Sequence, residues 1–380
     1  MAEHPRRARL RPQARRLWDT LQGKVPDRVP RQELFFHNPA IETHIIGRPI
    51  DRVFERSLEF ASEIGWGSAR ATSWGTRIGA RNAVASDGTS HYAGGSAVTP
   101  KDLDELGQGD PAQIAEHYAP QAEMIHAEGL LSHIFMLHCF HSAATGLGME
   151  RLCLMVYDQP KLLGEYMQRV EVYNRRVLRE VLATGIVPDI AIFDADCAFK
   201  TALMVSPPTY RKLIFEPTRA TCEMLRDAGI TIMMHTDGKI DDVYPVWLEM
   251  GMVGAHGVEK QANDLAEVKR RFGDRMTLFG NFDPVVLATE TPERIREMAR
   301  QMVQVGKPGG RYVAAVNTIV GENVPVPNYM AFIEGVEEAA PYRTATGPPC
   351  VVPPSVDPRG GWPDATAHNC GPGQGKIRWP

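Results

Sequence analysis

The 380-residue sequence lacks the features that mark several large classes of protein. It has six cysteines and no Cys-x-x-Cys pair, so we expect no disulfide scaffold and a reducing, cytoplasmic location. No apolar run approaches the roughly 18 to 20 residues that span a bilayer. The net charge is −4 and the pI is near 6.3, which gives no bulk attraction to nucleic acid or to an anionic membrane. The sequence therefore predicts a soluble protein that binds neither.

Several short catalytic and binding motifs are also missing. The sequence contains no Gly-x-Gly-x-x-Gly and no phosphate-binding P-loop motif, which disfavours nucleotide binding. It contains no Gly-x-Ser-x-Gly, the motif that places a nucleophilic serine in many hydrolases. Its chemistry must therefore come from other residues.

The two ends of the chain differ from the rest in composition. Residues 1–13 form a basic, arginine-rich extension with no apolar segment behind it, so a secretory signal is not expected. A solvated basic stretch and a transit peptide remain as alternatives. Residues 344–380 contain 8 prolines and 6 glycines and show no apolar periodicity, which predicts a disordered tail.

Between these ends, eight short apolar segments alternate with helical patterns. The segments are residues 29–36, 66–72, 133–140, 189–196, 231–236, 252–258, 276–282 and 312–318. Such alternation implies parallel strands joined by crossover helices, and eight units favour a closed barrel over an open sheet. We expect an α/β fold, a single (β/α)8 TIM barrel over residues 14–343, with residues 73–130 as an insertion over its mouth.

The helical patterns carry recognisable ends. Ser206 and Thr291 each precede a proline, which is the order expected for a cap followed by the first helical residue. For the long helix that precedes Ser206 in the chain, we expect Asp158 to be the cap and Gly185 to end the helix.

Polar residues end nearly every expected strand. Active sites of such barrels lie at the carboxyl ends of the strands, so these residues are the candidates for chemistry. They are Glu33, His37, His138, His141, Asp194, Asp196, His235, Asp237, His256, Glu259, Asn281, Asp283, Asn317 and Thr318.

Two pairs in this set are spaced two residues apart. His235 and Asp237 can point to one side of an extended strand end, where they could ligate a metal or act as a base and its orienting group. The alternative is an Asp-Gly turn beside a hydrogen-bonded histidine. Asp194 and Asp196 also share a strand face and could shift each other's pKa; alternatively, one caps a helix and the other is solvated.

The remaining candidates have equally plain alternatives. His138 and His141, three residues apart, fit a helical turn, and either could be a satisfied core histidine. Asn281 and Asp283 could simply complete a tight turn. His256 carries a weaker case for function than His235.

Five segments carry a resemblance to a known superfamily. They read GKVPDRVP, HTDGKIDDVYPVWLEMGMVGAHGVE, RFGDRMTLFGNFDP, TPERIREMARQMV and VPVPNYMAFIEGVEE, in that order. Together they resemble the uroporphyrinogen decarboxylase superfamily, which contains the decarboxylase of haem synthesis and the corrinoid-dependent methyltransferases. The resemblance implies a (β/α)8 barrel with the active site in its mouth.

Individual residues separate the two branches. The decarboxylases carry an arginine-bearing first loop, an aspartate after the second strand and a late histidine; the corresponding places here read RQELFFHNPAIE, GWGSARATSW and AVNTIVG. The methyltransferases hold zinc through a His-x-Cys motif and a late cysteine. Here these places are His235-x-Asp237 and Asn317 or Thr318, so the resemblance is closer to the methyltransferases but implies an oxygen-rich site.

We therefore expect an enzyme that moves a methyl group between a small molecule and a corrinoid or tetrahydrofolate carrier. His235, Asp237 and Asp196 are the expected catalytic residues, and His235 and Asp237 are the expected ligands of a divalent metal such as zinc. The expected substrate-binding residues are His138, Asp194, His256, Asn281, Asp283 and Asn317. A corrinoid protein is a candidate partner and a homodimer a candidate assembly. A decarboxylase or other lyase acting on a small carboxylate or a porphyrinogen-like substrate, and a non-catalytic binding barrel, remain as alternatives.

Overall fold

The computed structural model describes residues 5–49, 53–75, 79–84, 90–96, 99, 101 and 109–342. The predicted tail, residues 344–380, lies outside the described residues, as do parts of the predicted insertion.

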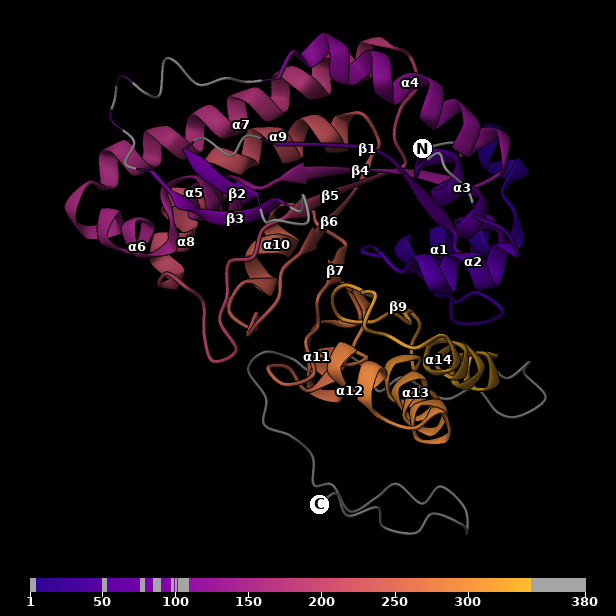
Figure 1. Cartoon of the computed structure of the whole chain (residues 1–380). Helices are drawn as coiled ribbons and strands as arrows, with labels where there is room; N and C mark the ends of the chain where they lie inside the picture. The colour runs from indigo at the N-terminus through magenta and orange to yellow at the C-terminus, as the bar shows by residue number, and fades with distance from the viewer. Residues whose placement is uncertain are drawn as a thin grey trace, which may run out of the picture. The chain divides into compact units, whose positions relative to one another are not determined.

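The described strands form one large parallel sheet and one small antiparallel pair (Figure 1). The parallel sheet runs in the order β1-β4-β5-β6-β7-β8-β9, and β2 pairs with β3. The strands are β1 (Ser68–Trp74), β2 (Ala80–Val84), β3 (Ser90–Gly95), β4 (Leu131–Leu137), β5 (Ile190–Asp194), β6 (Thr231–His235), β7 (Gly254–His256), β8 (Thr277–Phe279) and β9 (Tyr312–Val313).

The segment before β1 supplies the eighth position of the barrel. Arg31 forms a parallel bridge with Ala314, just beyond β9. On the other side, the Gln32 side chain takes the place of a strand ladder: its Oε1 accepts from the amides of Gly67 and Ser68 at 3.1 and 2.9 Å. The barrel closes because one buried amide side chain joins the first segment to β1. The predicted α/β barrel is confirmed.

Helices connect and cover the strands. The longer ones, α4 and α7, lie side by side (Figure 1). The helices are α1 (Pro12–Leu21), α2 (Pro39–Ile46), α3 (Val53–Glu63), α4 (Pro111–Ala127), α5 (Cys139–Leu147), α6 (Met149–Asp158), α7 (Pro160–Ala183), α8 (Pro207–Tyr210), α9 (Glu216–Asp227), α10 (Tyr244–Glu249), α11 (Leu265–Phe272), α12 (Pro284–Thr289), α13 (Pro292–Gly306) and α14 (Val326–Ala339), with a 3-10 helix at Pro5–Arg9 and a π-helical turn at Arg211–Phe215.

Most of the predicted helix ends are observed. Ser206 caps α8 and Thr291 caps α13, each through its side-chain oxygen. The prediction for α7 was wrong at one residue: Asp158 ends α6, and Gln159 precedes α7 without a side-chain cap. The short helix α6 ends directly before α7, and its last residue is the aspartate that was predicted to cap α7.

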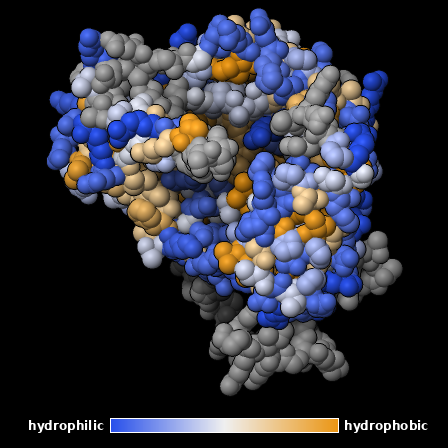
Figure 2. Space-filling model, in the orientation of Figure 1, coloured by the Kyte–Doolittle hydropathy of each residue, from blue (hydrophilic) through white to orange (hydrophobic). Residues whose placement is uncertain are grey.

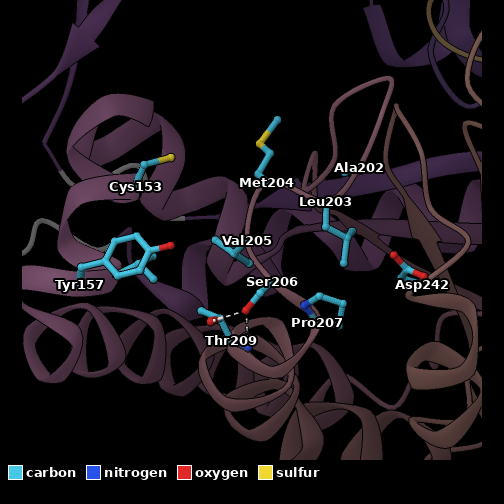
Figure 3. A pocket seen from close by; sticks show the side chains of 11 residues that line it. Cys153, Tyr157, Ala202, Leu203, Met204, Val205, Ser206, Pro207, Thr209 and Asp242 are labelled. Carbon is cyan, nitrogen blue, oxygen red and sulfur yellow. Dashed lines mark hydrogen bonds between the residues drawn. The ribbon is translucent and has the colours of Figure 1, made fainter.

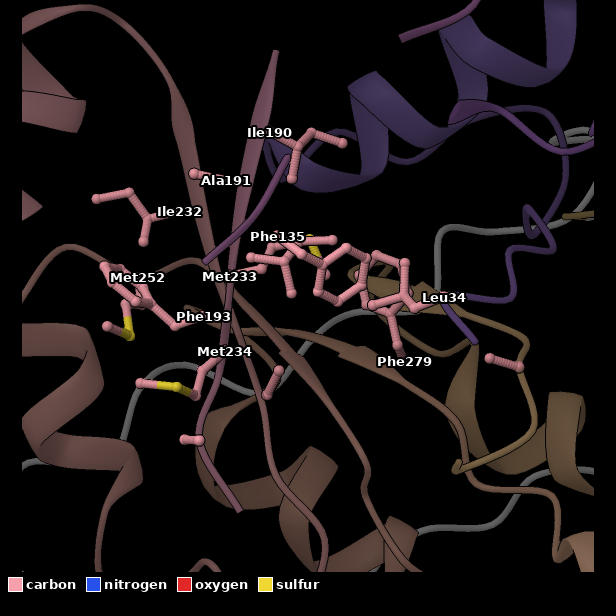
Figure 4. Packing of buried hydrophobic residues seen from close by; sticks show 14 of the residues in the cluster. Leu34, Phe135, Ile190, Ala191, Phe193, Ile232, Met233, Met234, Met252 and Phe279 are labelled. Atoms are coloured by element: carbon pink, nitrogen blue, oxygen red, sulfur yellow. The ribbon is translucent and has the colours of Figure 1, made fainter. Parts of the chain in front are cut away.

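The hydrophobic core fills the barrel interior and the layer between the strands and the helices that cover them. Figure 4 shows part of it, with Phe135 of β4, Phe193 of β5, Met233 and Met234 of β6 and Phe279 of β8. All five are nearly or fully buried. This packing holds the strand ends, and the polar residues that follow them, in fixed positions.

The stretch predicted as an insertion over the mouth contains two different parts. The β2–β3 hairpin packs against α5, and the Ser96 amide donates to the Gly146 carbonyl at 3.1 Å. Because α5 starts at the carboxyl end of β4, the hairpin lies on the mouth side of the barrel. By contrast, α4 is an ordinary barrel helix that packs on β1 and α7.

No helix among the described residues is long and apolar enough to cross a membrane. Figure 2 shows one face of the molecule covered mostly by hydrophilic side chains, with apolar ones in small separate groups.

Candidate functional site

The strand register aligns polar side chains at the mouth of the barrel. Asp194 of β5 pairs with His235 of β6, and His235 pairs with His256 of β7. Leu137 and Phe279 extend this row on either side. Paired residues of neighbouring parallel strands point to the same face of a sheet. The row therefore sets one carboxylate and two imidazoles on a common face.

His235 and His256 form a buried, hydrogen-bonded pair. Their Nδ1 atoms lie 2.8 Å apart, and the ring centroid of Phe35 lies 4.5 Å from that of His235. Burial, and then the proximity of His235, lowers the pKa of His256 well below its ordinary value. His256 is therefore neutral, and one proton lies between the two Nδ1 atoms. This bond fixes the His235 ring with its Nε2 facing Asp196, 3.7 Å away.

Asp196 stands between two histidines. Its Oδ1 is 3.7 Å from His235 Nε2, and its Oδ2 is 3.7 Å from His141 Nδ1. Asp194 Oδ1 also contacts His141 Nδ1, at 3.1 Å. The backbone φ of Asp196 is +37°, a left-handed conformation that non-glycine residues rarely adopt. A turn beyond the strand, rather than strand alternation, thus brings the two carboxylates to the same imidazole.

Asp237 lies on the turn that follows β6. Its Oδ1 is buried and has no hydrogen-bond partner among the described residues. Burial raises the pKa of Asp237 to about 6, the proximity of His235 lowers it, and the nearby Asp196 and Glu259 raise it. The carboxyl group therefore gains and loses its proton close to neutral pH.

The next residue, Gly238, holds this turn in place. Its φ is +88°, and a Cβ atom there would lie 2.6 Å from the Ala198 carbonyl oxygen. The Gly238 amide donates to Glu259 Oε2 at 3.0 Å, and Lys200 Nζ lies 3.3 Å from the other carboxylate oxygen of Glu259. Only glycine allows the backbone to approach this closely, and the approach positions Asp237 beside His235.

The side chains around Asp196 have the composition of a metal site. Asp196, His235 and Asp237 can bring one ligand atom each within 4.8 Å of one another, as can His141, Asp194 and Asp196. In the first group, Asp196 Oδ1 and Asp237 Oδ1 are buried without a hydrogen-bond partner among the described residues. Buried carboxylate oxygens are costly unless paired, and one imidazole with two carboxylates is a common set for a divalent cation. The residues present therefore fit such an ion.

His138, predicted to bind substrate, points away from this centre. It caps α5, and its Nε2 lies 3.1 Å from Thr218 Oγ1 on α9. Burial lowers its pKa to about 3. The structure places His141, one helical turn later, beside the carboxylates instead.

The three later candidates lie beyond β8 and β9. Asp283 caps α12, accepting from the Val285 amide at 2.8 Å, and also accepts from the Gln261 side chain. Asn281 and Asn317 are buried, and Asn317 Oδ1 has no hydrogen-bond partner among the described residues. Their predicted contact with substrate remains a prediction.

Phe35 and Arg70 were not identified from the sequence. Phe35 follows Glu33 by two residues in the first segment, a spacing that could have suggested a shared face. Arg70 is the charged residue of β1, a strand otherwise built from small residues and one tryptophan.

A separate cavity of about 300 Å³ lies beside α6 and α8 (Figure 3). Its lining includes Cys153, Tyr157, Met204 and Asp242. None of the predicted site residues lines it, so the histidine and carboxylate centre is a distinct feature.

The fold and the site place the protein in the class of parallel α/β barrels with a polar centre at the mouth. The family described as uroporphyrinogen decarboxylase (URO-D) matches residues 135–339, and the chain belongs to this family.

Curated relatives are similar over part of their length. The uroporphyrinogen decarboxylase of Alkalilimnicola ehrlichii is 28% identical over 198 residues, which cover 50% of this chain and 51% of that protein. The one from Psychromonas ingrahamii is 41% identical over 82 residues, covering 21% and 23%. The matched part of the chain thus covers about half of the A. ehrlichii protein and about a quarter of the P. ingrahamii protein.

Among solved structures, a methyltransferase from Methanosarcina mazei is similar over 86% of this chain and 98% of its own. The TM-score is 0.63 and the sequence identity is 15%, which establishes a shared fold.

Proposed function

We propose that this barrel transfers a methyl group between a small molecule and a corrinoid or tetrahydrofolate carrier, with a divalent cation such as zinc at Asp196, His235 and Asp237. One observation carries the proposal: the His235 imidazole, held by His256, faces two carboxylates, each with a buried oxygen that has no hydrogen-bond partner among the described residues. Such a site is prepared for a cation or for the proton of an acceptor.

Two comparisons support the methyl-transfer reading. The M. mazei methyltransferase shares the fold across nearly its whole length. In addition, His235-x-Asp237 occupies the place of the zinc-binding His-x-Cys of the methyltransferases that the sequence resembles. Replacing thiolates by carboxylates favours harder ions and a more exchangeable site.

Each residue of the centre has a stated role. His235 Nε2, Asp196 and Asp237 would hold the cation, which would stabilise the deprotonated form of a thiol or hydroxyl acceptor. His256 orients His235 through the hydrogen bond between their Nδ1 atoms. Asp237, with its pKa raised to about 6, can accept the acceptor's proton when it is not ligating the cation.

The transfer step balances without an external oxidant or reductant. The acceptor would give its proton to the site, its sulfur or oxygen would form a bond to the methyl carbon, and the bond from that carbon to the carrier would break. The electron pair of the broken bond would stay on the carrier. A carrier supplied by a separate corrinoid protein would need to reach the mouth of the barrel.

Decarboxylation of a small carboxylate is the second candidate. The names of the curated relatives favour it, and a carboxyl group with a pKa of about 6 can return a proton to the carbanion left after loss of CO₂.

A methyl-transfer assay separates the candidates. Purified protein is given methylcobalamin or methyltetrahydrofolate with a panel of thiols and phenols, with zinc present. We expect transfer from one carrier, reduced at least about 100-fold by His235→Ala, a loss of ~2.7 kcal/mol in transition-state stabilisation. The exposed His117→Ala on α4 serves as the control and should retain full transfer. No transfer from either carrier would contradict the proposal; release of CO₂ from small carboxylates would then establish the second candidate, and binding without turnover a non-catalytic barrel.

A further inference from the structure

Two residues on the inner face of β1 are exposed to solvent, although β1 is a strand of the barrel. Its outward residues, including Ala71 and Trp74, are buried beneath α3 and α4. Its exposed residues are Arg70 and Ser73. The register pairs these two with His133 and Phe135 of β4, and the irregularity after Arg70 keeps both on the same face.

This face belongs to the same interior as the histidine and carboxylate centre. Arg70 Cζ lies 5.7 Å from the ring centroid of Phe135. Phe135 lies 5.2 Å from Phe35, and Phe35 lies 4.5 Å from His235, between ring centroids. Arg70 and His235 therefore stand at opposite ends of one contiguous run of side chains.

Arg70 has no carboxylate partner among the described residues. Neither a hydrogen bond nor an ion pair joins its guanidinium to another described side chain, and burial lowers its pKa with no acidic group to offset it. His133, its neighbour across the strands, offers no compensation, because burial and then Arg70 lower the pKa of His133 to about 3. A partly desolvated guanidinium normally carries a bound anion or a carboxylate.

The side chains between Arg70 and His235 are aromatic and apolar. Phe135 is almost fully buried and Phe35 is half-buried, so the aromatic surface that remains accessible near Arg70 belongs to Phe35. A planar or apolar body could pack on this surface while a guanidinium fork binds a carboxylate at one end.

We infer that Arg70 is the anion-binding group of the substrate site. The substrate class is a small carboxylate with an apolar, planar body: the carboxylate pairs with Arg70, the body packs on Phe35, and the far end meets His235 and Asp237. This assignment adds a substrate class to the proposed function, and the role it gives to His235 and Asp237 rests on that function. Arg70 would select the substrate and position it, without taking part in the chemical step.

Calorimetric titration of the full chain with benzoate and benzamide tests the assignment. The two probes have the same shape and differ in charge, and no carrier or metal is added. We expect benzoate to bind at least about 10-fold more tightly than benzamide, as a charge-assisted pair requires. Arg70→Gln should abolish this preference, whereas Arg270→Gln, an exposed arginine on α11, should keep it.

A measurement on the unaltered protein covers the case in which Arg70→Gln does not fold. Phenylglyoxal modifies accessible arginines, and peptide mass spectrometry reports the modification of Arg70. Benzoate should protect Arg70 and benzamide should not. Equal affinity for the two probes, an unchanged preference in folded Arg70→Gln, or equal protection would each overturn the assignment. Because binding is measured without a methyl carrier, failure of methyl transfer leaves this result standing.

Discussion

The Nδ1 atoms of His235 and His256 lie 2.8 Å apart, in a buried pair packed against Phe35. The bond to the neutral His256 holds His235 in the orientation in which Nε2 faces Asp196. The second histidine thus acts on the centre through the first.

Replacement of His256 should therefore weaken the centre in a graded way. His256→Leu removes the partner of His235 and should lower cation affinity and turnover about 10- to 100-fold. His256→Asn places an amide near the position of Nδ1 and should restore part of both. If both variants lost the same cation affinity and turnover, and their melting temperatures fell in proportion, His256 would have only a packing role.

Glu33 should make stability depend on pH. It is buried, accepts from the Val316 amide at 2.9 Å, and burial raises its pKa from 4.5 to about 8. In the unfolded chain Glu33 loses its proton near pH 4.5, so between pH 4.5 and 8 the folded state binds more protons. The free energy of unfolding should fall as the pH rises through this window.

Glu33→Gln isolates this effect, because the amide can still accept from Val316 and has no proton to lose. The variant should match the natural protein at pH 4.5 and exceed its unfolding free energy by on the order of 3 kcal/mol at pH 9. Denaturant unfolding at both pH values measures the difference. Glu123→Gln, at an exposed position of α4, should show no such change. An equal gain at both pH values would rule out ionisation as the cause.

Gly238→Ala tests the turn that positions Asp237. Gly238 and Gly185 both have left-handed backbones, with φ of +88° and +78°, but a Cβ meets carbonyl oxygens at 2.6 Å only in the first case. Gly185→Ala should cost about 1 kcal/mol of stability from backbone strain alone. Gly238→Ala should cost more and should also reduce turnover, because the turn must shift. Equal thermal shifts in the two variants would contradict the close approach.

The barrel could be predicted from the sequence because its signals are local. The apolar segment at 231–236 became β6, and the one at 189–196 became β5, each within two residues at most of the expected ends. Closure through Gln32 could not be predicted, since a side chain replaces the strand ladder there. The cap of α7 was assigned wrongly because α6 ends at the same aspartate.

The site is less visible in the sequence for physical reasons. Spacing placed His235 and Asp237 together, but Asp196 reaches them through a left-handed turn that no periodicity describes. His138 and His141 look equivalent in the sequence. In the structure α5 begins between them, and His138 points away from the carboxylates while His141 contacts them. Arg70 could not be identified from the sequence, because its exposure on the inner face of β1 depends on the side chains of other strands around it.

The most direct test is the cation content of the purified chain after equilibration with zinc and dialysis, compared with Asp237→Ala and with His117→Ala as the control. We expect about one ion per chain in the natural protein and the control, and a loss of most of it in Asp237→Ala. No bound ion in the natural protein, or equal content in all three, would contradict a metal centre at Asp196, His235 and Asp237.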